Sequence, residues 1–178
     1  MAHRTESLRL ADLTPYHVAL SAMRLLSEKL TETFKHLDTV VSLKGSVDPS
    51  KLASSELGLF IQDITAYAHT GDEPMRNWKH LGKQISAVTL AMFGDARYEI
   101  HSCDVDDELG LVLVAASARI TLDNRCDVTA KQLAALASCS TANLSHLART
   151  ETLERSAHGT YERKSALRWL KERGIEGL

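Results

Sequence analysis

The sequence lacks the features that mark membrane-spanning and secreted proteins. Only 5% of its 178 residues are aromatic, so the core must be built mainly from Leu, Val, Ala and Ile within a hydrophobic fraction of 44%. No apolar run approaches the roughly 18 residues that cross a bilayer, and the longest candidate covers residues 109–116. Residues 1–13 lack the apolar core of a signal peptide. We therefore expect a cytoplasmic protein without a membrane span.

Cysteine is scarce, and the usual catalytic motifs are missing. Cys103, Cys126 and Cys139 are an odd number at unrelated spacings, without a C-x-x-C pair. This favours reduced thiols over a disulfide framework or a zinc site. The sequence has no H-x-x-x-H or H-E-x-x-H pair, no glycine-rich phosphate loop and no G-x-S-x-G. We expect no enzymatic activity, no cofactor and no bound metal.

Two polar clusters are the remaining candidates for chemistry. Residues 101–104, His-Ser-Cys-Asp, are adjacent, but neighbours in an extended segment point to alternate sides. A surface loop is the simpler interpretation. The acidic run Asp104, Asp106, Asp107 and Glu108 could attract a cation, but it lacks the glycine and the ligand order of a calcium loop. Charge at a helix N-terminus explains this run more simply.

Charge is distributed unevenly along the chain. The net charge is −2, yet residues 119–178 hold 10 Lys/Arg against 7 Asp/Glu, while residues 1–118 hold 11 against 16. The C-terminal part is therefore the positive one, as expected if it alone meets the phosphates of a nucleic acid. The excess is small, so we expect weak and salt-sensitive non-specific affinity.

Residues 128–149 have the pattern of two short helices joined by a tight turn. Thr129 can cap the first helix, and Ser140 can cap the second after a turn at residues 138–140. The apolar residues fall where such a hairpin must bury them. These positions are Leu133, Ala134, Leu136, Ala137, Leu144 and Leu147.

This stretch resembles the helix-turn-helix of bacterial and phage DNA-binding proteins. That family usually has glycine at the first turn position, where this chain has Ser138. Residues 150–161 hold two short candidate strands around residues 157–159, and residues 165–174 predict a last helix that stops at Gly174. This order is similar to the small winged domains of excisionase-like and MerR-like proteins, and the resemblance covers roughly the last third of the chain.

The resemblance implies a winged helix-turn-helix with a short β-hairpin at residues 106–178. The apolar pattern of the rest of the chain predicts a helical N-terminal domain at residues 1–105, so we expect a mainly α-helical protein. The second helix of the helix-turn-helix would read base edges in the major groove, and the wing would lie beside the phosphates. The residues expected to contact double-stranded DNA are Thr141, Asn143, Ser145, His146, Arg149, Arg155, His158, Arg163 and Lys164. The implied function is sequence-specific DNA binding, as in a transcriptional regulator. The alternative is a protein adaptor or inhibitor whose winged domain docks on protein.

The N-terminal part is predicted to be helical. Thr14 and Pro15 start a helix of about 28 residues, longer than most in globular proteins. Its apolar stripe from Met23 to Val40 either crosses the domain or meets a second copy of the chain, and we expect a homodimer. A protein partner for these helices is the alternative. Further helices are predicted at residues 50–68, 78–94 and 109–120, the last leading into the motif, with a short strand at residues 97–101.

Overall fold

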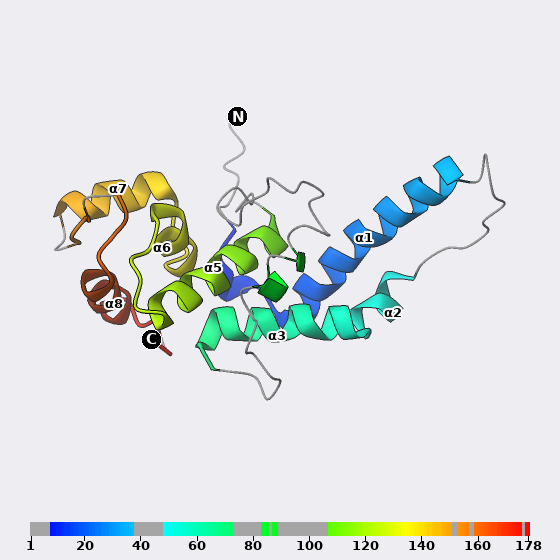
Figure 1. Ribbon diagram of the computed structural model, residues 1–178, viewed down its shortest axis with the longest axis horizontal. Helices are drawn as coiled ribbons and strands as arrows, with labels where there is room; N and C mark the ends of the chain where they lie inside the picture. Colours follow the sequence, from blue (N-terminus) through cyan, green and yellow to red (C-terminus); the bar gives the residue numbers. More distant parts are fainter. Residues whose placement is uncertain are drawn as a thin grey trace.

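The computed structural model describes residues 8–37, 48–72, 83–85, 87–88, 107–150, 153–156, 159–175 and 177–178, and it places side chains in all of these except residues 31–37 and 147–150. The described residues are mainly helical (Figure 1). Their named elements are η1 (Leu10–Asp12), α1 (Pro15–Leu37), α2 (Pro49–Ala53), α3 (Glu56–Thr70), α5 (Glu108–Asp123), α6 (Ala130–Leu136), α7 (Thr141–Thr150) and α8 (Arg163–Glu172). None of the helices searched in this part is both long and apolar enough to span a membrane.

The long helix α1 begins where the sequence predicts. Pro15 is its first residue, and the hydroxyl of Thr14 accepts the N–H of His17 at 3.3 Å. The helix packs along α2 and α3. Met23 is fully buried in this contact, whereas Leu30 is only partly buried. The predicted extension beyond Leu37 lies outside the described residues.

The single helix predicted for residues 50–68 is wrong, because the chain forms two helices there. The side chain of Ser55 caps α3 by accepting the N–H of Gly58 at 3.3 Å. Gly58 lies so close to the carbonyl of Ala53 that a Cβ at this position would overlap it. The break at residues 54–55 therefore depends on a tight backbone approach that apolar periodicity does not report.

Only fragments of the helix predicted at residues 78–94 can be compared with the structure. Ile85 and Val88 are helical and buried, as predicted. The rest of this segment lies outside the described residues, as do the strand expected at residues 97–101 and the cluster at residues 101–104.

Helix α5 is the centre of the molecule. It packs against α1 and α3 on one side and against α6 on the other (Figure 1). Eleven of its sixteen residues are buried, and nine of these belong to one hydrophobic core that extends from Leu10 to Leu170. Asp107 caps α5 by accepting the N–H of Gly110 at 2.8 Å, so it lies at a helix N-terminus as predicted, while Asp104 and Asp106 lie outside the described residues. The predicted helical nature of this segment is also confirmed.

The expected β-hairpin wing at residues 150–161 is wrong. Tyr161 forms one isolated bridge with Val128 and another with Arg155, and the described residues contain no β-strand. This pairing is one residue deep because α8 begins at Arg163, only two residues after Tyr161. The winged fold is therefore corrected to a mainly helical one, in which a further helix follows α6 and α7.

Candidate nucleic-acid interface

Helix α6 is fixed on the central helix α5 by one buried amide. Thr129 and Gln132 form a capping box, in which each side chain accepts the backbone N–H of the other, at 3.2 and 2.9 Å. The amide nitrogen of Gln132 also donates to the hydroxyls of Ser117 and Thr121 on α5, at 3.2 and 3.1 Å. Because Gln132 is 3% exposed and its amide is well paired, the network gives α6 a defined position. The predicted cap at Thr129 is confirmed.

The turn between α6 and α7 has the geometry that usually selects glycine. Ser138 has a φ of 50°, in the left-handed region that a Cβ disfavours. Its N–H donates to the carbonyl of Ala135 at 3.3 Å, and the N–H of Cys139 donates to that of Ala134 at 3.0 Å. These two bonds form a Schellman motif with Ser138 at its left-handed position. The hydroxyl of Ser140 then accepts the N–H of Asn143 at 3.1 Å and caps α7, as predicted.

Helix α7 is anchored by one face and presents the other to solvent. Leu144 is fully buried, while Ser145 is half-buried and donates its hydroxyl to the carbonyl of Thr141 at 2.9 Å. The side chains of Leu147 and Arg149 lie outside the described part. The exposed side chains are Thr141, Ala142, Asn143 and His146. We call this set the reading face, and α7 contains no acidic residue.

The two arginines assigned to the wing both contact other groups of the chain. Arg155 is exposed, but its guanidinium donates to the hydroxyl of Tyr161 at 3.1 Å and lies 5.3 Å from the centre of that ring. The guanidinium of Arg163 donates to the carbonyl of Leu122 at 2.6 Å and so caps the end of α5. Lys164 is exposed in the first turn of α8, and His158 lies outside the described residues.

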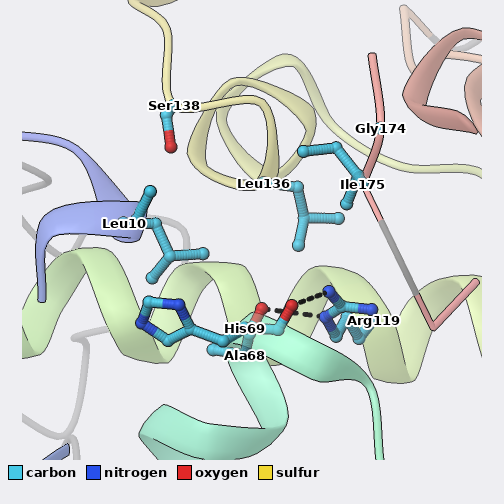
Figure 2. Close-up of a pocket in the computed structure, with 9 residues that line it drawn as sticks. Leu10, Ala68, His69, Arg119, Leu136, Ser138, Gly174 and Ile175 are labelled. Atoms are coloured by element: carbon cyan, nitrogen blue, oxygen red, sulfur yellow. Dashed lines mark hydrogen bonds between the residues drawn. The ribbon is translucent and has the colours of Figure 1, made fainter. Parts of the chain in front are cut away.

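A buried arginine joins the end of α3 to the last residues of the chain. Arg119 is 1% exposed and donates to the carbonyls of Ala68 at 2.8 Å, His69 at 2.6 Å and Gly177 at 2.9 Å. Figure 2 shows its guanidinium reaching across to the carbonyls at the end of α3. Desolvation lowers the pKa of Arg119, although the charges of Tyr67, Asp123 and Asp72 oppose this shift. A cation is well placed at a helix C-terminus, where carbonyls point outward.

A cavity of about 210 Å³ lies at the same junction, between α3, α5 and the turn that follows α6 (Figure 2). His69 lines this cavity, and burial lowers the pKa of its imidazole. The charge of Arg119 lowers this pKa further, whereas a hydrogen bond with the backbone of Leu13 raises it. Burial also raises the pKa of the Cys139 thiol in the turn, against the charge of Arg173. Neither group belongs to a cluster that could hold a metal ion among the described residues.

The structure adds positively charged residues that the sequence analysis did not assign to the interface. Arg168 and Lys171 are exposed on α8, and they share a helix face with Lys164 because their spacing is i, i+4 and i+7. That spacing is visible in the sequence, but the positive residues of the interface were expected in the wing, at residues 155–164.

Comparison with protein-family models, with curated proteins and with solved structures finds no match for this chain.

Proposed function

We propose that this chain is a sequence-specific DNA-binding protein that places α7 in the major groove. The observation that carries the proposal is the reading face, held at a fixed angle by the turn at Ser138 and the buried side chain of Leu144. In helix-turn-helix recognition the N-terminal residues of the second helix contact base edges. Thr141 and Asn143 occupy those positions on α7.

The chemistry of the reading face supports base contact. Asn143 can pair with the two major-groove atoms of adenine, and Thr141 and His146 supply further hydrogen-bonding groups. The absence of acidic residues from α7 leaves the positive end of its dipole uncompensated toward phosphate. A well-formed contact between Asn143 and adenine contributes about 1–3 kcal/mol to discrimination between bases.

Selection of bound duplexes from a random-sequence pool tests the proposal. We expect one enriched sequence, and we expect Asn143→Ala to lower affinity for it by roughly 5- to 150-fold, which corresponds to that contact energy. Asn124→Ala is the matched control, since Asn124 is exposed at the end of α5, away from α7. A pool without enrichment, or equal affinities for both variants and the wild type, would contradict the proposal.

We propose that the protein binds DNA as a homodimer in the cytoplasm, as a transcriptional regulator does. One small helical unit makes few contacts, so a second copy would supply the affinity that an operator requires. Met23 is buried within the monomer and cannot contribute to the dimer contact, whereas Leu30 is only partly buried and can contribute to it. A two-fold dimer reads half-sites about 10 bp apart, or a multiple of that spacing.

A further inference from the structure

Three exposed cations form a single line along α8. Lys164, Arg168 and Lys171 lie within about 60° of one another around the helix axis. They are opposite the face that α8 buries, which consists of Ser165, Ala166, Trp169 and Leu170. We call these three residues the α8 stripe.

The dipole of α8 does not account for Lys164, the first residue of the stripe. A helix favours acidic residues in its first turn and basic residues in its last. Here the first turn holds no acidic residue but contains Arg163 and Lys164. Arg163 is explained by its bond to the carbonyl of Leu122, whereas Lys164 is exposed to solvent against the helix dipole. The exposed N-cap residue Glu162 supplies one negative charge at this helix end, and an anion outside the chain would stabilise Lys164 there further.

The dimensions of the stripe suit the backbone of a nucleic acid. Lys164 and Lys171 are seven residues apart, or about 10 Å along the helix. Phosphates on one strand of duplex DNA repeat every 3.4 Å or so along the duplex axis, so the stripe can meet two or three of them. A groove of about 450 Å³ borders the stripe, with Ile175 and Leu178 forming part of its other wall.

We infer that the α8 stripe is the phosphate-contacting surface of this protein, taking the place that the sequence analysis gave to a wing. This inference rests on the proposed DNA binding and adds a second surface to the reading face. Helices α7 and α8 both lie at the end of the molecule away from α1–α3 (Figure 1).

The test is the salt dependence of binding to two fluorescent duplexes, the selected sequence and an unrelated one. The variant Lys164→Gln, Arg168→Gln, Lys171→Gln removes the stripe while retaining good helix formers. The control Arg9→Gln, Arg24→Gln, Lys51→Gln makes the same change in net charge at exposed residues outside α8. Circular dichroism and urea unfolding establish that each variant is folded.

We expect the stripe variant to lose affinity for both duplexes to a similar degree. The plot of log affinity against log salt concentration has a negative slope, and its magnitude should decrease by about 2–3 relative to wild type. The reason is that each phosphate contact contributes roughly 0.9 to that magnitude. The control variant should keep a slope within about 1 of wild type. A stripe variant whose slope equals that of the control would overturn the inference, as would a wild type that binds neither duplex.

Failure of the stripe can be told apart from failure of the reading face. If the stripe variant loses slope while Asn143→Ala leaves sequence preference intact, the stripe contacts phosphate but α7 does not read bases. If Asn143→Ala loses preference while the stripe variant keeps its slope, α7 reads bases and the phosphate contacts lie elsewhere.

Discussion

Replacing Arg119 by methionine tests whether one buried side chain holds the N-terminal helices to the end of the chain. Methionine fills a similar volume but cannot donate to the three carbonyls that Arg119 reaches on Ala68, His69 and Gly177. Gly71 and Gly177 both have left-handed φ values, and a Cβ on either would overlap backbone of the other segment. The carbonyls are therefore held in a tight backbone contact, with little room to turn toward other donors.

The size of the effect follows from two opposing contributions. Each hydrogen bond from a charged donor stabilises a fold by about 1.5–3 kcal/mol. Burying the guanidinium costs several kcal/mol, and the lowered pKa of Arg119 has the same physical cause. Arg119→Met leaves three carbonyls without this donor, at about 1–3 kcal/mol each, but it also relieves the desolvation cost of the guanidinium, and we expect a net loss of about 3–5 kcal/mol. Arg119→Lys should be intermediate, since an ammonium keeps the charge without the planar fork.

Urea unfolding followed by circular dichroism measures this difference. At a slope of about 2 kcal/mol/M, a loss of 4 kcal/mol lowers the midpoint by about 2 M. Arg24→Met is the matched control, because Arg24 is exposed on α1 and the chemical change is identical. Equal midpoints for Arg119→Met and Arg24→Met would refute the assignment of Arg119 as a structural link.

Three further outcomes are expected. Ser138→Gly should raise the free energy of unfolding by about 0.5–1 kcal/mol, because glycine accepts the left-handed φ at this position; a loss of stability in urea would contradict this. Because burial lowers the pKa of His69 in the folded chain, the unfolded chain binds this proton at a higher pH. The free energy of unfolding should therefore fall as the pH drops from about 6.5 toward the folded pKa. His69→Gln should show a smaller fall than wild type, and an unchanged pH profile would contradict this. Leu30→Glu should convert a dimer to folded monomers in light scattering, whereas an unfolded variant would place Leu30 in the monomer core.

The sequence predicted those helix boundaries that depend on local chemistry. Pro15, Thr129 and Ser140 mark helix starts because a capping group or a fixed φ acts within a few residues. Gly174 ends α8 with a φ of 72°, for the same local reason. Signals of this kind do not depend on the rest of the fold.

The wing could not be predicted correctly, since strand formation depends on pairing partners distant in sequence. Tyr161 pairs with Val128, 33 residues earlier, and α8 starts too soon for a second strand to extend. Arg119 was counted only in the charge of the C-terminal part, and Arg163 was expected to contact DNA. Both instead cap helix ends through contacts more than 40 residues away. Neither contact has a local sequence signal, whereas the α8 stripe does, in its i, i+4, i+7 spacing.

The proposed contact between Asn143 and a base in the major groove can be tested by a double-mutant cycle that changes both the protein and the DNA. The affinities of wild type and Asn143→Ala are measured for the selected duplex. They are then measured for a set of duplexes in each of which one adenine is replaced by 7-deazaadenine, an analogue that lacks the N7 acceptor. We expect one position where the two changes are coupled by about 1–3 kcal/mol, so that the analogue weakens binding by wild type but not by the variant. Additive losses at every adenine would show that Asn143 makes no contact with an adenine N7, and would contradict the proposal.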